Sequence, residues 1–289
     1  MNDTRIQLVA FDLDGTVLDG DEGLSAPTAA AMQAAAERGV VFAAATGRSP
    51  GLIPPSISSL PCIQYAICAN GAYIQRLSDR KPLETSPLSP EVIRQVIALA
   101  RPSGAALVAF TAEYSICERA GLVRLGVNRL REGEPTDAQP KERRRSQIVE
   151  DGTSQILTAD SPILKLICVY PSPAEGERML PLFQSLPVVE AVTTTGLDLE
   201  VTAAGVTKGA GIAALAKRLD IPKDRILALG DSGNDISMRE YVGTFVAMGN
   251  ATRDVKQAAD YITGCVWEDG AAHALERLLG NCDWKEGTL

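Results

Sequence analysis

The sequence predicts an α/β protein whose main domain is a doubly wound, mostly parallel sheet, interrupted by a second unit of mixed α+β character. Short apolar runs alternate with helical patterns in the first and last parts of the chain. Residues that can carry chemistry follow the ends of several of these runs. Uninterrupted apolar runs bounded by turn signals are typical of strands buried on both faces, as in parallel sheets.

The first predicted elements alternate between strand and helix. A strand is predicted over 8–11, and residues 25–27 open an alanine-rich helix that Gly39 ends. Proline is favoured at the start of a helix and glycine just past its end. The apolar runs at 40–45 and 65–69 are predicted as two further buried strands. Strands and helices in alternation indicate a doubly wound sheet.

The pattern changes in the middle of the chain. A helix is predicted over 90–100, with shorter strand-like runs at 105–110 and 163–170 and prolines between them. Because 289 residues are comfortable for two domains, we expect an inserted α+β unit over residues 83–192.

Strand and helix alternate again in the last part of the chain. The predicted elements are a strand at 197–201, a helix at 208–219, strands at 226–229, 245–248 and 260–262, and a helix at 270–279. The main domain is therefore expected to comprise residues 1–82 and 193–289.

Composition is that of an ordinary globular chain. Hydrophobic residues make up 45% and charged residues 22%, and the formal net charge is −8. This acidity argues against nucleic-acid and anionic-membrane partners, although a local positive pocket can still bind an anionic substrate. The six cysteines form no C-x-x-C pair, and neither a signal peptide nor a membrane span is apparent, so a cytoplasmic location is expected. Composition does not indicate the oligomeric state.

Polar residues collect where the predicted strands end and where one helix begins. They are Asp12, Asp14, Thr46, Lys208, Asp231, Asn234 and Asp235. Ligands of parallel sheets bind beyond the carboxyl ends of the strands, so these residues are expected to share one crevice. Clustered carboxylates repel one another unless a cation joins them, and oxygen ligands suit Mg²⁺. A hydroxyl group and a lysine beside that ion would complete a site for a phosphoryl group.

Simpler interpretations exist for parts of this pattern. Taken alone, Asp12 and Asp14 are also compatible with a solvated Asp-Gly turn at the end of a strand. The single histidine, His273, lies in a predicted helix, and one histidine excludes a multi-histidine metal site.

Four segments resemble, in order, the motifs of the haloacid dehalogenase superfamily of phosphatases. They are FDLDGT at 11–16, ATGR at 45–48, GVTKG at 205–209 and GDSGND at 230–235. VAMGNA at 246–251 and EDG at 268–270 are similar to the C-terminal pattern of the Cof-like, class IIB branch. The resemblance implies a Rossmann-like core and, over 83–192, a cap domain of the C2B type.

The resemblance also implies the roles of the acidic residues. Asp12 would be the nucleophile that forms an aspartyl-phosphate, and Asp14 the general acid and then the general base. The side chains of Asp12 and Asp231 and the backbone carbonyl of Asp14 would hold Mg²⁺. Asp235 would support Lys208 or the outer shell of the metal.

The remaining residues would bind the substrate. The resemblance implies that Thr46 and the Gly47 amide bind phosphate oxygens, and that Lys208 neutralises the nucleophile and the phosphoryl charge. Asn234 would bind phosphate or a metal-bound water. For Asn70, which ends a strand beside the site, both a role in lining the site and a simple turn remain open.

The implied activity is hydrolysis of a small phosphorylated metabolite, with sugar phosphates first and phosphorylated cofactor precursors second. A phosphomutase on the same core is an alternative, because a phosphoryl group on Asp12 can pass to another hydroxyl. A phosphate-accepting signalling or binding protein is a second alternative, against which Asp14 and the size of the inserted unit argue.

Overall fold

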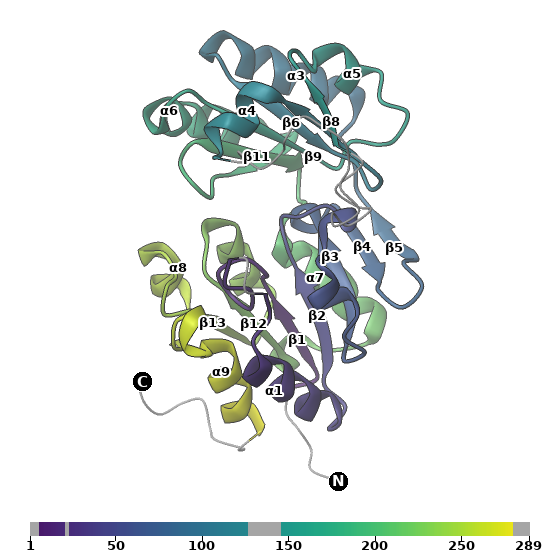
Figure 1. Ribbon diagram of the computed structural model, residues 1–289, viewed down its shortest axis with the longest axis vertical. Helices are drawn as coiled ribbons and strands as arrows, with labels where there is room; N and C mark the ends of the chain where they lie inside the picture. The colour runs from purple at the N-terminus through teal and green to yellow at the C-terminus, as the bar shows by residue number, and fades with distance from the viewer. Residues whose placement is uncertain (1–5, 21–22, 127–145, 280–289) are drawn as a thin grey trace. The chain divides into compact units, whose positions relative to one another are not determined.

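The computed structural model describes residues 6–20, 23–126 and 146–279. The chain divides into two compact units, each with its own sheet (Figure 1). The core unit comprises Met1–Gly47, Ile53–Glu84 and Thr207–Leu289, and the cap unit comprises Arg48–Leu52 and Thr85–Val206. Within the described ranges no helix has the length and apolar character needed to cross a membrane.

The described part of the core unit is built on an eight-stranded sheet in the order β14-β13-β12-β1-β2-β3-β4-β5. The strands are β1 (Leu8–Phe11), β2 (Val41–Ala45), β3 (Ile63–Cys68), β4 (Tyr73–Arg76), β5 (Pro82–Thr85), β12 (Ile226–Gly230), β13 (Thr244–Ala247) and β14 (Tyr261–Ile262). Neighbouring strands from β14 to β3 are parallel, and β4 is antiparallel to β3. The predicted α/β fold with a mostly parallel sheet is confirmed.

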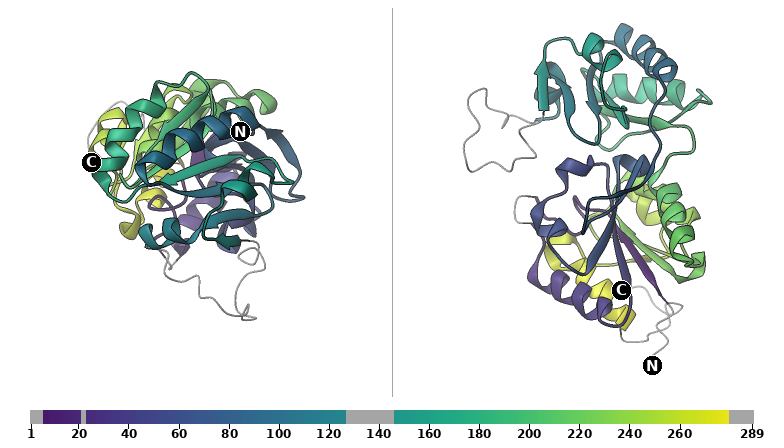
Figure 2. Two further views of the ribbon diagram at one scale, coloured as in Figure 1. Left: turned by 90° about the horizontal axis from the view of Figure 1, so that it is seen from above. Right: turned by 90° about the vertical axis from the view of Figure 1, so that its right-hand side faces the viewer.

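Helices cover both faces of the core sheet (Figure 2). The helices are α1 (Ala26–Ala36), α2 (Pro55–Ser58), α7 (Lys208–Leu219), α8 (Arg253–Ala258) and α9 (Gly270–Leu279). Short 3₁₀ segments of the core unit are η2 (Ala69–Gly71), η5 (Lys223–Arg225), η6 (Gly233–Glu240) and η7 (Val266–Glu268), whereas η1 (Pro50–Leu52) belongs to the cap unit. Helices α1 and α9 pack together on one face, and α7 packs against η6 on the other. This is the doubly wound arrangement.

Two of the core helices begin at a capping hydroxyl group. The side chain of Ser25 accepts a hydrogen bond from the amide of Thr28 at 3.3 Å, and that of Thr207 accepts one from Ala210 at 3.1 Å. Such caps satisfy amides that have no partner within the helix. The cap at Thr207 makes Lys208 the first residue of α7. The helix predicted over 208–219 is confirmed.

The described part of the cap unit contains a six-stranded sheet in the order β10-β11-β9-β6-β7-β8. The strands are β6 (Ala106–Phe110), β7 (Ser115–Glu118), β8 (Ser146–Val149), β9 (Lys165–Val169), β10 (Val189–Val192) and β11 (Asp198–Ala203). The helices are α3 (Pro90–Ala100), α4 (Arg119–Arg124), α5 (Thr153–Leu157) and α6 (Pro173–Gln184), with η3 (Arg101–Ser103) following α3. Apolar residues of α3 and α6 share a hydrophobic cluster with those of the sheet.

One strand lies in a different sheet from the one expected. The run predicted at 197–201 forms β11, which pairs antiparallel with β9 and β10 in the cap unit. The expectation that the core sheet resumes with this strand is wrong, and the core unit resumes at Thr207. Leu199 and Val201 alternate with polar residues and point into the cap cluster. This alternation is typical of antiparallel sheets rather than of a buried parallel strand.

The central core strands end in register. Phe11 at the end of β1 pairs with Leu229 of β12 on one side and with Ala44 of β2 on the other. The next strand continues this edge, because the amide of Thr46 donates a hydrogen bond to the carbonyl of Ile67 in β3 at 2.8 Å. The residues that follow these strands therefore lie along one edge of the sheet.

Gly209→Ala is expected to lower stability, although alanine is the better helix former by about 1 kcal/mol. A Cβ atom at position 209 would lie 2.1 Å from the carbonyl oxygen of Ser237 in η6. Helix α7 would have to move, at an expected cost of about 1–3 kcal/mol. Thermal unfolding measures the effect. Gly51→Ala is the control, because a Cβ there meets nothing within 4 Å; equal unfolding temperatures for the two variants would contradict the tight packing of α7.

Candidate active site

A buried lysine joins two aspartates at the carboxyl edge of the core sheet. The Nζ atom of Lys208 lies 2.6 Å from Oδ1 of Asp12 and 2.7 Å from Oδ1 of Asp235. The Lys208 side chain is 1% exposed. Burial favours its neutral form, but the charges of Asp12 and Asp235 outweigh burial and raise the pKa of Lys208. The ammonium group therefore stays charged, even at a helix N-terminus, where the helix dipole is unfavourable to a cation.

Asp235 uses both of its carboxylate oxygens inside the protein. Oδ1 accepts from Lys208, while Oδ2 accepts from the backbone amides of Asp231 and Ser232 at 2.9 and 3.0 Å. The side chain is fully buried. Asp235 also completes a capping box with Ser232 at the start of η6. Its contacts thus fix the loop after β12 against the lysine of α7.

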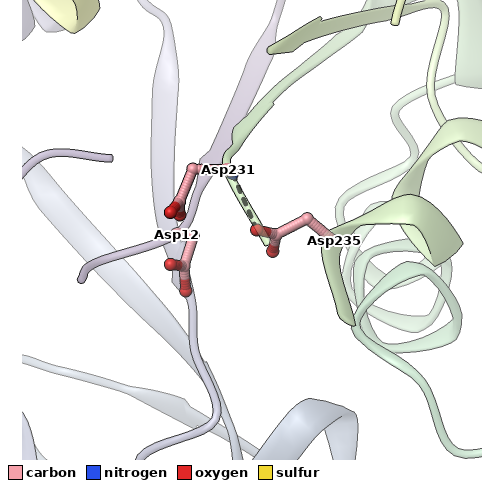
Figure 3. A group of neighbouring side chains, drawn as sticks. All are labelled: Asp12, Asp231 and Asp235. Carbon is pink, nitrogen blue, oxygen red and sulfur yellow. Dashed lines mark hydrogen bonds between the residues drawn. The ribbon is translucent and has the colours of Figure 1, made fainter. Parts of the chain in front are cut away.

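Three carboxylates meet beside the lysine. Oxygens of Asp12, Asp231 and Asp235 all lie within 4.8 Å of one another. Figure 3 shows the carboxyl groups of Asp12 and Asp231 next to each other, with Asp235 reaching toward them from η6. Since Asp235 is engaged by Lys208 and two amides, Asp12 and Asp231 are the pair best suited to bind an additional group.

Burial and neighbouring carboxylates both raise the pKa values of Asp12 and Asp231. Burial raises the pKa of Asp12 to about 8, against the opposing charge of Lys208. Burial, followed by the charge of Asp235, raises the pKa of Asp231 to about 6, against a hydrogen bond from Thr16. Lys208 and Thr16 therefore do not fully offset the effect of burial on these two carboxylates.

The turn after β1 packs directly against Asp231. The Thr16 hydroxyl donates to Oδ1 of Asp231 at 3.1 Å. Gly15 has a φ of +81°, and a Cβ atom there would lie 2.5 Å from Oδ2 of Asp231, so only glycine fits. The side chain of Asp14, the residue before this glycine, is exposed. Asp14 is thus held on a tight turn with its carboxyl group accessible.

Thr46 and Gly47 follow β2, the neighbour of β1 in the sheet. The Thr46 side chain is buried, and its backbone carbonyl accepts a hydrogen bond from the Asn70 amide at 3.1 Å. The alignment of the strand ends therefore places these two residues at the same edge as Asp12.

Asn234 is held at both ends of its carboxamide. Its Oδ1 accepts from the Ser232 hydroxyl at 2.9 Å, and its Nδ2 donates to Oδ1 of Asn70 at 3.3 Å. The Asn234 side chain is buried. These two hydrogen bonds fix its orientation from within the core unit.

The structure places all the residues predicted from the sequence in the core unit. They are Asp12, Asp14, Thr46, Gly47, Lys208, Asp231, Asn234 and Asp235. Direct contacts connect Lys208 with Asp12 and Asp235, and Asp235 with the backbone of Asp231.

Sequence reasoning gave no role to Thr16 or Asn250, although both lie in the segments that resemble motifs. Asn250 donates from Nδ2 to the Gly15 carbonyl at 2.8 Å and accepts the Val266 amide at 2.8 Å. It ties the turn after β1 to the C-terminal part of the core. The partners lie far apart in the sequence, and the only available signal was the presence of Thr16 and Asn250 within those segments.

Comparison with known proteins identifies the family. The sequence profile of the haloacid dehalogenase-like hydrolases matches residues 9–275. Phosphatase YwpJ of Bacillus subtilis (strain 168) is 26% identical over 286 residues, covering 95% of this chain and 100% of that protein. The 5-amino-6-(5-phospho-D-ribitylamino)uracil phosphatase YcsE of the same organism is 28% identical over 281 residues, covering 96% and 97%.

Solved structures share the fold over nearly the whole chain. A haloacid dehalogenase-like hydrolase from B. subtilis has a TM-score of 0.81 at 25% identity, covering 94% of this chain and 100% of that one. A sugar phosphatase of haloacid dehalogenase subclass IIB has a TM-score of 0.78 at 24% identity, covering 94% and 98%. Because the profile spans most of the sequence and these folds agree with it, the chain belongs to the haloacid dehalogenase-like hydrolases, as its motifs predict.

Proposed function

We propose that the protein is a magnesium-dependent phosphomonoester hydrolase that works through an aspartyl-phosphate on Asp12. The observation that carries this proposal is the Lys208 ammonium group, which lies within hydrogen-bonding distance of both Asp12 and Asp235. A carboxylate held in one orientation by a buried cation is suited to act as a nucleophile toward an anionic phosphoryl group, because the cation offsets their repulsion.

The donor set fits Mg²⁺. Asp12 and Asp231 offer hard carboxylate oxygens within 4.8 Å of each other, and a cation beside them would stabilise the ionised forms that burial, with neighbouring carboxylates second, disfavours. The two side chains, with the backbone carbonyl of Asp14, would hold the ion. The bound ion would supply positive charge for the approach of the phosphate group and for its transfer.

The chain's own residues account for both halves of the reaction. An oxygen of Asp12 bonds to phosphorus while the bond from phosphorus to the leaving alcohol breaks, and Asp14 gives that alcohol its proton. Asp14, now ionised, takes a proton from water as the water oxygen attacks phosphorus. The bond to Asp12 then breaks, inorganic phosphate leaves, and both carboxyl groups return to their starting state. The exposure of the Asp14 side chain suits this exchange of protons with substrate and water.

The remaining residues orient the phosphoryl group. We assign Thr46, the Gly47 amide and Asn234 to its oxygens, and Lys208 to the charge shared by the group and Asp12. Asp235 is assigned to holding Lys208, because its oxygens accept from that lysine and from two backbone amides.

The proposed substrate is a small phosphorylated metabolite, a sugar phosphate or a phosphorylated cofactor precursor. In support, one relative is a phosphatase of a phosphoribitylamino-uracil, and one solved structure of the same fold is that of a sugar phosphatase. We propose that the core unit carries the chemistry and the cap unit selects the substrate.

Phosphatase activity is expected to depend on a divalent cation and on Asp12. The purified protein is expected to release inorganic phosphate from p-nitrophenyl phosphate with Mg²⁺ and to lose this activity after exhaustive chelation. Asp12→Asn is expected to reduce turnover by about 10⁴-fold or more, since an amide is not a competent nucleophile. Asp254→Asn, an exposed position in α8, is the control and should remain active. Turnover that survives chelation, or an active Asp12→Asn variant, would contradict the proposal.

The affinity of the site for Mg²⁺ is expected to depend on pH. The raised pKa values of Asp12 and Asp231 mean that protons compete with a cation for these carboxylates as the pH falls. Affinity for Mg²⁺ should therefore rise with pH between pH 6 and pH 8. Titration calorimetry in buffers of different ionisation enthalpy should show protons released as the ion binds. Equal affinity across this range, with no proton release, would rule this coupling out.

Removal of the cap unit is expected to abolish substrate selectivity but not activity. Replacing residues 86–205 by a short Gly/Ser linker should leave hydrolysis of p-nitrophenyl phosphate, because the assigned catalytic residues all belong to the core unit. The ratios of kcat/KM among sugar phosphates and other natural esters should become nearly equal. Thermal unfolding verifies that the shortened protein is folded. If the folded, capless protein keeps the selectivity profile of the full chain, specificity belongs to the core loops instead.

A further inference from the structure

Three consecutive residues adopt a left-handed backbone directly after β3. The φ angles of Ala69, Asn70 and Gly71 are 49°, 55° and 104°. A residue with a Cβ atom is strained in this region, and here two such residues follow one another. Backbone strain persists only where surrounding contacts hold it, and it concentrates at functional sites.

The turn is wedged between two parts of the candidate active site. The amide of Asn70 donates to the carbonyl of Thr46 at 3.1 Å. On the other side, a Cβ atom at Gly71 would lie 2.2 Å from the carbonyl oxygen of Thr207, the residue before Lys208. The turn therefore packs against the end of β2 and against the start of α7.

The side chain of Asn70 has a further partner. It is 4% exposed, and its Oδ1 accepts a hydrogen bond from Nδ2 of Asn234 at 3.3 Å. The other end of the Asn234 carboxamide accepts from the Ser232 hydroxyl. Ser232 contacts the oxygen of Asn234 and Asn70 contacts its nitrogen, so the two hydrogen bonds together hold this amide in one orientation. Glycine at position 70 would make the same turn without strain, but it would leave Nδ2 of Asn234 without this partner.

We propose that Asn70 is a positioning residue, which holds the carboxamide of Asn234 in the orientation that meets the phosphoryl group. The strained turn brings the Asn70 side chain to Asn234 from the end of β3. This inference rests on the proposed function, in which Asn234 binds the phosphoryl group. Groups held in place before the substrate binds lose less conformational freedom in the reaction, and small displacements of such groups can be costly.

Asn70→Gly tests the side chain while keeping the backbone conformation. This variant is expected to lower kcat/KM for p-nitrophenyl phosphate by about 10–100-fold, with little change in the thermal unfolding temperature. Ala69→Gly is the matched control, because it relaxes the same left-handed turn and leaves the Asn70 side chain in place. Its kcat/KM is expected to stay within about twofold of the parent protein. Full activity in Asn70→Gly, or an equal loss in Ala69→Gly, would overturn the proposal.

A double-mutant cycle separates positioning from a general structural effect. If Asn70 acts through Asn234, adding Asn70→Gly to Asn234→Ala should produce no further loss. The same pattern is expected for binding of inorganic phosphate measured by calorimetry. Losses that multiply in the double variant would show that Asn70 acts independently of Asn234.

A spectroscopic measurement distinguishes failure of the positioning inference from failure of the proposed function. In ¹⁵N-labelled protein without ligand, the side-chain amide signal of Asn234 should shift in Asn70→Gly and remain in place in Ala69→Gly. An unchanged signal in Asn70→Gly would overturn the positioning inference whatever the protein hydrolyses. A shifted signal in a protein without any phosphatase activity would uphold the contact and refute the proposed function.

Discussion

The buried ammonium group of Lys208 is the interaction on which the rest of the site depends. A charge removed from water is costly unless opposite charges meet it closely, and removing one partner leaves the other uncompensated. Lys208 meets Asp12 at 2.6 Å and Asp235 at 2.7 Å, so the end of β1, the start of α7 and the start of η6 must keep their relative positions. The parallel core sheet holds these relative positions, because the ends of its central strands are aligned.

Close approach of backbone to side chain is the second constraint. Besides Gly15 and Gly71, Gly230 admits no side chain, since a Cβ atom there would lie 2.5 Å from the Cβ of Asp235. These glycines allow the segments after β1, β3 and β12 and the start of α7 to pack closely around several carboxylates. The density that results explains the raised pKa values of Asp12 and Asp231, because it excludes the water that would stabilise their charged forms.

The sequence predicts the core well because its signals are local. Buried strands, helix caps and the polar residues after each strand can be identified within a few positions of one another, and the core helices at 208–219 and 270–279 have the predicted bounds. Strand β11, which is expected to resume the core sheet, lies in the cap sheet instead, and its alternation of apolar and polar residues fits that antiparallel position. The hydrogen bonds from Thr16 to Asp231, from Asn234 to Asn70 and from Asn250 to Gly15 join residues 164 to 235 positions apart, which no periodicity reveals. For the same reason, sequence alone left open what Asp235 contacts.

The most direct test of this account is to locate the covalent phosphoryl group. Enzyme mixed with substrate and Mg²⁺ can be quenched in acid during turnover and reduced with borohydride, which converts a phosphorylated aspartate into homoserine. Peptide mass spectrometry then identifies the position. The account predicts homoserine at position 12, formed only when substrate is present. Homoserine at position 14 or 231, or none in an enzyme that is turning over, would contradict it.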